Sequence, residues 1–116
     1  MRVVVYNPLS LVQPFRLHEI PSRLSHIDII VCPGTRLRSR LEQEQTVLRM
    51  KDHDVYSWGY GRGPNTNRST GVTFFLKKGM FRDKHVVSIQ SPPREMQGRA
   101  GAMRLKSGRY DICTIY

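Results

Sequence analysis

The sequence predicts a mixed α/β domain in which a strand–helix–strand unit is followed by a series of antiparallel strands. Two short apolar runs, Val3–Tyr6 and Ile27–Cys32, flank a segment whose apolar residues recur at helical spacing. Further strand-like runs, separated by turn residues, fill the second half of the chain. Strands joined through a helix pair in parallel, whereas strands joined by tight turns pair antiparallel, so this order predicts both parts of the fold. The length of 116 residues permits one domain with a single modest core.

Residues 1–50 are predicted to form a strand, a helix, a second strand and a second helix. Val3–Tyr6 ends at a turn signal and is expected to be a buried strand. Phe15–Leu24 has the spacing of a short amphipathic helix. Ile27–Cys32 is rich in β-branched residues and is expected to be the central strand, buried on both faces. Thr35–Met50, which has a thin apolar stripe, is expected to be a surface helix.

Residues 51–116 are predicted to be antiparallel strands arranged around a polar, turn-rich loop at residues 61–71. The last two strands are expected to form a hairpin across Lys106–Arg109. Tyr56, Trp58 and Tyr60 occupy every second position of one strand and so share one face, where packing is favoured over a platform for stacking bases. The predicted strands are Asp54–Tyr60, Val72–Leu76, His85–Gln90, Arg99–Leu105 and Tyr110–Tyr116.

The central strand ends abruptly at Pro33-Gly34, and this turn is the first place to look for chemistry, because ligands of α/β sheets bind at the carboxyl ends of strands. No catalytic constellation is found in the chain. The four histidines are scattered, and no carboxylates pair at a spacing suited to acid–base catalysis. Cys32 and Cys113 both lie in apolar runs, which favours two buried thiols over a disulfide or a zinc site. Composition alone therefore indicates a basic α/β domain without an assignable reaction.

The net charge of +10 is concentrated in the second half of the chain. Residues 1–61 contain 8 Lys/Arg and 6 Asp/Glu, whereas residues 62–116 contain 11 and 3. Such an excess favours a polyanionic partner, which is nucleic acid or, less often, an acidic protein or a membrane surface, over a solvated basic surface that only aids solubility. The candidate nucleic-acid-binding residues are Arg62, Arg68, Lys77, Lys78, Arg99 and Arg104.

The expected compartment follows from what the sequence does not contain. No apolar stretch approaches the length needed to span a bilayer, and the first apolar run is too short for a signal peptide. We therefore expect no transmembrane segment and a soluble protein of a reducing compartment, with the nucleus and an organelle complex both left open. The expected partners are other protein chains, with DNA or RNA as the alternative.

Several short motifs follow one another in an order that one family shares. These segments are Val4–Asn7, Asp28–Arg36, Ser69–Val72, Gly98–Ala100, Met103–Leu105 and Ile112–Tyr116. Together with the Arg-containing helix between the first two, they resemble the exonuclease–endonuclease–phosphatase superfamily. The closest similarity is to the apurinic-type endonuclease domain of non-LTR retrotransposons, with its Ser-Gly-Gly-Val strand, its Gly-Arg strand and the strand leading to its Tyr-x-Pro motif. The resemblance implies a single truncated endonuclease-like domain over residues 1–116.

The resemblance implies roles for three positions. Asn7 matches the first-strand Asn that helps to organise the metal and phosphate site, and Tyr116 falls where the family has an active-site Tyr. Gly34 falls where the family has the Glu that binds Mg²⁺, and glycine offers no carboxylate to a hard cation. The chain also ends before the family's Asp-x-Asn and Ser-Asp-His segments. The resemblance therefore implies catalytic remnants without a metal site, and Mg²⁺ is expected as a cofactor only if the family activity survives.

The resemblance further implies half of a two-sheet sandwich, because the family's second sheet comes largely from the part that this chain lacks. One apolar sheet face is then expected to be uncovered, with Phe74, Leu76 and Val87 as candidates. We expect a non-catalytic accessory or structural subunit of a larger assembly, in which a partner covers this face. The alternative is a basic nucleic-acid-binding remnant of a retroelement endonuclease. An active Mg²⁺-dependent nuclease is not expected, since the Glu of the metal site is replaced.

Overall fold

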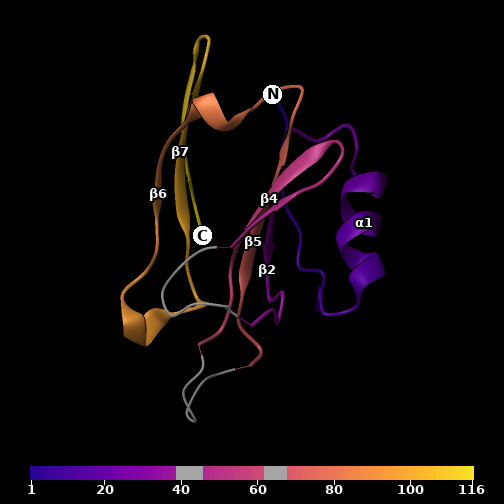
Figure 1. The fold of residues 1–116 in the computed structure, drawn as a ribbon, viewed down its shortest axis with the longest axis vertical. Helices are drawn as coiled ribbons and strands as arrows, with labels where there is room; N and C mark the ends of the chain where they lie inside the picture. The colour runs from indigo at the N-terminus through magenta and orange to yellow at the C-terminus, as the bar shows by residue number, and fades with distance from the viewer. Residues whose placement is uncertain (39–45, 62–67) are drawn as a thin grey trace.

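The computed structural model describes residues 1–38, 46–61 and 68–116, and these residues form three layers (Figure 1). A five-stranded mixed sheet lies in the middle. The helix α1 covers one of its faces, and a three-stranded antiparallel sheet covers the other. The fold is therefore α/β, with a strand–helix–strand unit before the antiparallel strands, as the sequence predicts.

The five-stranded sheet begins with a parallel pair and continues antiparallel. β1 (Val3–Val5) pairs with β2 (Ile29–Pro33), and α1 (Pro14–Arg23) connects them. Pro14 lies in the first turn of α1, where a missing N–H removes no intrahelical hydrogen bond. The sheet order is β1–β2–β5–β4–β3, in which β5 is Val72–Lys77, β4 is His53–Trp58 and β3 is Thr46–Arg49.

The second sheet consists of β6 (Val86–Gln90), β7 (Ala102–Ser107) and β8 (Tyr110–Ile115). β7 and β8 form the predicted hairpin. Gly108 in its turn has a φ of +56°, a conformation that glycine adopts without steric cost. Two short 3-10 helices flank β6 along the chain, η1 (Asp83–His85) and η2 (Arg94–Met96).

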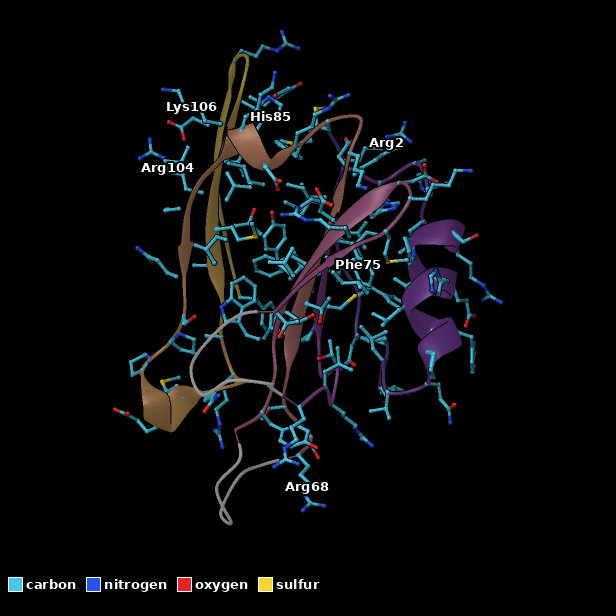
Figure 2. All side chains as sticks on the ribbon, viewed as in Figure 1. Arg2, Arg68, Phe75, His85, Arg104 and Lys106 are labelled. Carbon is cyan, nitrogen blue, oxygen red and sulfur yellow. The ribbon has the colours of Figure 1, made fainter. Side chains whose placement is uncertain are left out.

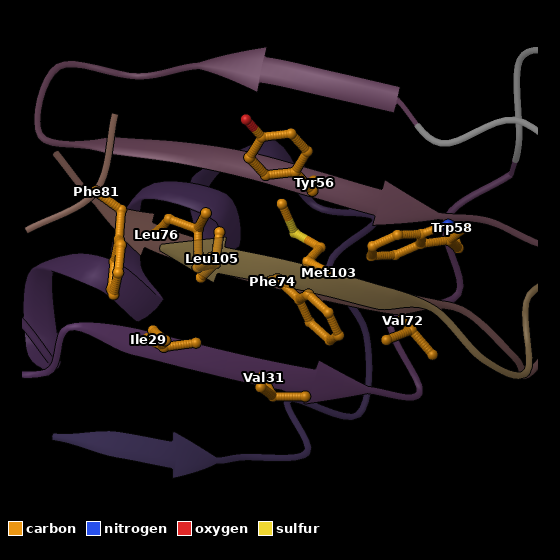
Figure 3. Close-up of a cluster of buried hydrophobic side chains, with 10 residues drawn as sticks. All are labelled: Ile29, Val31, Tyr56, Trp58, Val72, Phe74, Leu76, Phe81, Met103 and Leu105. Atoms are coloured by element: carbon orange, nitrogen blue, oxygen red, sulfur yellow. The ribbon is translucent and has the colours of Figure 1, made fainter. Parts of the chain in front are cut away.

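The main hydrophobic core lies between the two sheets (Figure 3). β7 crosses over the five-stranded sheet and packs Met103 and Leu105 against it. The rings of Trp58 and Phe74 meet edge to face with their centroids 5.0 Å apart. Tyr56 and Trp58 thus pack in the core, which is the role that their spacing favours. The buried members of this core are Ile29, Val31, Tyr56, Trp58, Val72, Phe74, Leu76, Phe81, Met103 and Leu105.

The expectation that Phe74 and Leu76 lie on an uncovered face is wrong. They are 0% and 2% exposed, because the chain's own second sheet covers them. Val87 is 54% exposed, but it belongs to β6 of the second sheet. The prediction that β1 is a buried strand is wrong, because β1 is a terminal strand of the sheet with exposed Val3 and Val5.

A second core fills the space between α1 and the other face of the five-stranded sheet. Ile20 of α1 packs with Ile30 and Cys32 of β2 and with Phe75 of β5. Burial raises the pKa of the Cys32 thiol to about 12, so this thiol is uncharged and a poor nucleophile at neutral pH. Cys32 is therefore the buried thiol that the sequence predicts, whereas the side chain of Cys113 lies outside the described part of the structure.

The helix predicted over Thr35–Met50 is not found in the described part of that segment. Residues 35–38 are not helical, and Thr46–Arg49 forms β3, which pairs antiparallel with β4. The β-branched side chains of Thr46 and Val47 suit a strand, and pairing with β4 outweighs a weak helical pattern. Residues 39–45 of the predicted helix lie outside the described residues.

Candidate functional site

At the carboxyl end of β2 the chain makes the sharp turn that the sequence indicates. Three segments meet there: Gly34–Arg36 after β2, Thr70-Gly71 before β5, and Gly98 before β7. The Thr35 N–H donates to the Gly71 carbonyl at 3.2 Å, and the Arg36 N–H donates to the Thr70 carbonyl at 2.9 Å. The Gly71 N–H in turn donates to the Gly98 carbonyl at 2.7 Å. We call this region the turn end of the five-stranded sheet.

Asn7 and Gly34, the two positions matched to the family's metal site, are neighbours at the turn end. A Cβ atom placed on Gly34 would lie 3.0 Å from Oδ1 of Asn7. That oxygen already accepts a hydrogen bond from the Leu9 N–H at 2.9 Å. Gly34 has a φ of +67°, a conformation that any larger residue adopts only under strain. The pair therefore forms a compact turn in which the polar group is an amide and not a carboxylate.

Thr35 is fully buried beside this pair, and its hydroxyl has no hydrogen-bond partner in the described structure. Gly71 packs so closely that a Cβ atom on it would lie 2.3 Å from Oγ1 of Thr35. Arg36 follows as an exposed cation with a φ of +59°. The turn end is therefore closely packed, with a positive charge at its rim.

Tyr116, the third matched position, lies just after β8 in the second sheet. Its N–H and C=O pair with Gly101 at 3.0 and 2.8 Å. Gly101 lies against the indole of Trp58, where a Cβ atom would be 2.4 Å from the ring. Tyr116 is 46% exposed and lies in the second sheet, apart from Asn7 and Gly34 at the turn end.

The candidate nucleic-acid-binding residues that the structure describes are spread over both ends of the molecule. Arg68 is exposed just before β5, whereas Lys77 and Lys78 lie at the opposite end of that strand. A strand of this length spans on the order of 17 Å. Figure 2 shows Arg68 and Arg104 far apart along the long axis of the molecule.

The remaining candidates also fail to join one cluster. Arg104 binds Asp111 through two hydrogen bonds of 2.9 and 2.7 Å, and this guanidinium holds the pKa of Asp111 below its usual value. Arg99 is exposed after η2. Arg62 lies outside the described residues.

A pocket that the sequence does not predict opens at the other end of the five-stranded sheet. It lies between the C-terminal half of α1, the β3–β4 hairpin and the turn that follows β5. Its volume is about 950 Å³, and it is open to solvent. Among its lining residues are His18, Ser22, Lys51, His53, Lys77 and Lys78. We call it the helix–hairpin pocket.

His53 and Asp54 are buried neighbours in β4, each 5% exposed, and they face opposite sides of the sheet. His53 shares its face with Val55, which packs toward α1, and its Nε2 atom has no hydrogen-bond partner in the described structure. Burial lowers the pKa of His53, and the charge of Lys77 acts in the same direction, whereas Asp52 and Asp54 oppose the shift. His53 is therefore a neutral ring at neutral pH.

Asp54 faces the second sheet and is held there by cations. Its Oδ2 atom lies 3.1 Å from Nη1 of Arg49, and Nζ of Lys78 lies 3.8 Å from its Oδ1 atom. Arg49 also pairs with Asp83 at 2.6 Å. The charge of Arg49 is thus largely matched by the carboxylates of Asp54 and Asp83, and Lys78 makes a longer contact with Asp54.

No sequence motif marks this pocket, because its residues come from three separate segments. His53 and Lys77 are register partners across β4 and β5, a relation that appears only once the strands are paired. The available signal was the pair His53-Asp54 at the start of an otherwise apolar strand, since buried polar residues usually have a structural or functional reason.

Among the described residues, no three His, Cys, Asp or Glu side chains are grouped so that they could hold a metal ion. The described part of the chain contains no helix long and apolar enough to cross a membrane. Comparison with protein-family models, with curated proteins and with solved structures found no match to this chain.

Proposed function

We propose that this chain is a non-catalytic subunit of a larger protein assembly, built on a degenerate endonuclease-like fold, and that it binds a partner protein at the margin formed by β1 and β8. The observation that carries this proposal is a difference in burial between two paired strands. Val3 and Val5 of β1 are the register partners of Ile29 and Val31 of β2. Val3 and Val5 are 49% and 62% exposed, whereas Ile29 and Val31 are 0% and 2% exposed.

Burial differs because the second sheet is narrower than the first and is held toward the β3 side. Asp83, just before β6, pairs with Arg49 of β3 at 2.6 Å. Ser91, just after β6, accepts a hydrogen bond from Nε1 of Trp58 in β4 at 3.2 Å. These contacts hold β6 near β3 and β4, and the order β6–β7–β8 then sets β8 on the side away from β3. The exposure of Val3 and Val5 indicates that the second sheet does not cover β1.

The partner is best placed beside β8. Among the described strands, both β1 and β8 are terminal in their sheets, so each has one side on which no described strand pairs with it. β1 has only three residues, and such short edge strands are poor templates for pairing. A partner strand added beside β8 would instead widen the second sheet over β1 and bury the exposed valines. Exposed apolar margins of this kind are typical of protein interfaces.

Charge indicates the chemistry of the partner. The net charge of +10 opposes association of two copies of this chain, because like charges repel across an interface. The same charge favours a partner whose apolar contact strand is flanked by Asp and Glu, since complementary potentials raise the association rate and select the partner. We therefore propose an acidic protein partner.

The turn end supports the non-catalytic part of the proposal. A glutamate at position 34 would have to adopt a φ near +67° and place its Cβ atom 3.0 Å from Oδ1 of Asn7. The backbone here suits glycine and not a metal-binding side chain. The resemblance to the endonuclease family therefore supports a shared fold without the family's metal chemistry.

The test places a photo-crosslinking amino acid at Val5, with the same substitution at Val87 as the matched control. Val87 is similarly exposed, at 54% against 62%, but it belongs to β6, the strand furthest from β8 in the second sheet. We expect one discrete adduct with an acidic protein at position 5 and none at position 87. The purified partner should then bind the chain, and Val5→Asp should weaken binding about tenfold or more, whereas Val87→Asp should not.

Three outcomes would overturn this proposal. The first is equal adducts at both positions, and the second is an adduct of the chain with itself. The third is cleavage of a DNA duplex by the purified chain with Mg²⁺. Salt-dependent DNA binding without an adduct at position 5 would replace the proposal with the nucleic-acid-binding alternative, because phosphate contacts release counterions.

A further inference from the structure

We infer that the helix–hairpin pocket binds a phosphate group, carried by free phosphate or by a small phosphomonoester. This site is separate from the protein-binding margin, since it lies on the α1 side of the five-stranded sheet and not on the side of β8. The inference rests on the pocket's charge, on one buried polar atom and on its size.

The pocket is strongly cationic. Lys51, Lys77 and Lys78 line it, and Asp52 is the carboxylate in its described lining. The ammonium of Lys77 donates to the Ser25 carbonyl at 2.7 Å, which fixes its position without neutralising its charge. Nζ of Lys78 lies 3.8 Å from Oδ1 of Asp54, so this ion pair is loose. Lysine ammonium groups are common binders of phosphate, and three lysine residues line this opening, although the ammonium of Lys78 lies near Asp54, which faces the second sheet.

His53 supplies the observation that points to a ligand. His53 is one of the pocket's lining residues and is 5% exposed, and its Nε2 atom is closed to solvent and has no hydrogen-bond partner in the described structure. Buried polar atoms are nearly always hydrogen-bonded, so an unpartnered one in a residue that lines a pocket indicates a missing partner, which a turn of the ring toward the opening would supply. A neutral imidazole can donate through Nε2, and a phosphate oxygen accepts such a bond. The hydroxyl of Ser22 is a second donor in the pocket lining.

The volume of about 950 Å³ exceeds the needs of a phosphate ion and is in the range of small-ligand pockets. Leu48 and Met50 of the hairpin add apolar wall, with β4 between β3 and the strand β5 that ends at Lys77. An organic group attached to the phosphate would lie there. If this wall contributes to affinity, the ligand is a phosphomonoester. If it does not, the ligand is free phosphate.

The experiment titrates the purified chain with inorganic phosphate, AMP and adenosine at constant ionic strength and follows the histidine ring nitrogens by NMR. We expect phosphate and AMP to shift the Nε2 resonance of His53 saturably while the exposed His26 stays unchanged. Equal affinities would identify free phosphate as the ligand class, and tighter AMP binding would identify a phosphomonoester. Adenosine binding as tight as that of AMP would overturn the inference.

Variants then separate this site from general charge attraction. His53→Leu should lower phosphate affinity about tenfold, and Lys51→Gln should lower it about threefold. Lys106→Gln removes the same charge at an exposed position in β7, outside the pocket, and should change affinity less than about twofold. Equal effects of Lys51→Gln and Lys106→Gln, or unchanged binding by a folded His53→Leu variant, would overturn the inference.

Discussion

The two ends of the five-stranded sheet are closed in different ways. At the turn end, three segments are joined by main-chain hydrogen bonds, and glycines at positions 34 and 71 allow them to approach closely. At the opposite end, which we call the pocket end, charged and polar side chains surround an opening of about 950 Å³. Each end holds a buried polar atom without a described partner, Oγ1 of Thr35 at the turn end and Nε2 of His53 at the pocket end.

A ligand site needs space and unsatisfied polar groups in the same place. The turn end has the unsatisfied hydroxyl of Thr35, but the backbone of Gly71 occupies the space beside it. The pocket end has both, because His53 lines an opening that lysines surround. The turn that the sequence singles out is thus chiefly a packing feature, and the pocket lies where no motif occurs.

The largest expected effect comes from adding one methyl group at the turn end. Gly71→Ala would place a Cβ atom 2.3 Å from Oγ1 of Thr35 and 3.1 Å from the backbone nitrogen of Arg36, at a φ of +127°. The chain must shift to relieve the overlap, so we expect the unfolding free energy to fall by about 3 kcal/mol or more. Urea unfolding followed by circular dichroism measures this change.

Gly79→Ala is the matched control at the pocket end. A Cβ atom on Gly79 meets no atom within 4 Å, so the unfolding free energy should change by less than about 0.5 kcal/mol. If the two variants lost similar stability, the contrast between a closed end and an open end would be wrong.

The second prediction concerns pH and the pocket end. Burial lowers the pKa of His53 below its ordinary value of 6.5, so the unfolded chain takes up this proton at a higher pH than the folded chain does. The unfolded state therefore binds more protons as the pH falls through 6.5, and the unfolding free energy decreases. The contribution of one histidine has a slope of at most about 1.4 kcal/mol per pH unit. Unfolding measured between pH 7 and 5 in phosphate-free buffer tests it.

His53→Gln should remove this dependence, because a neutral amide does not titrate in that range. His26→Gln is the control, since His26 is exposed. A wild-type chain whose stability is constant from pH 7 to 5, or a His53→Gln variant that keeps the full slope, would show that His53 is not buried as a neutral ring.

The sequence predicts correctly the strands, helices and turns whose structure depends mainly on their own residues. The β-branched run of β1, the helix α1 and the glycine turn between β7 and β8 all formed where their residues indicate. The segment Thr46–Arg49 was predicted incorrectly because its state depends on β4, a partner strand that its own residues do not encode. The burial of β1 was predicted incorrectly for a related reason. It depends on how far the second sheet extends and on long-range contacts between the sheets, such as those of Asp83 and Ser91 with the first sheet.

The same distinction applies to the sites. Asn7 and Gly34 follow adjacent parallel strands, so their proximity is consistent with the order of the predicted elements. The helix–hairpin pocket depends on the register that places His53 opposite Lys77 and on the packing of α1 across that end. Register is set by turn geometry and core packing together, and neither is visible in the separate segments.

The smallest expected effect returns to the turn end. Thr35→Val replaces the unpartnered hydroxyl with a methyl group of nearly the same shape in a position that is 0% exposed. A buried donor without a partner is costly, whereas a buried methyl group is favourable, so the unfolding free energy should stay constant or rise by about 0.5–1 kcal/mol.

Urea unfolding again measures the change, with Thr73→Val as the contrasting variant. Thr73 is equally buried, but its hydroxyl lies 3.0 Å from that of Ser57 and is hydrogen-bonded to it, so its loss should destabilise the chain. If both variants lowered the unfolding free energy equally, Oγ1 of Thr35 would have a hydrogen-bond partner in the folded chain. The turn end would then have to contain space for that partner, which contradicts its description as closed.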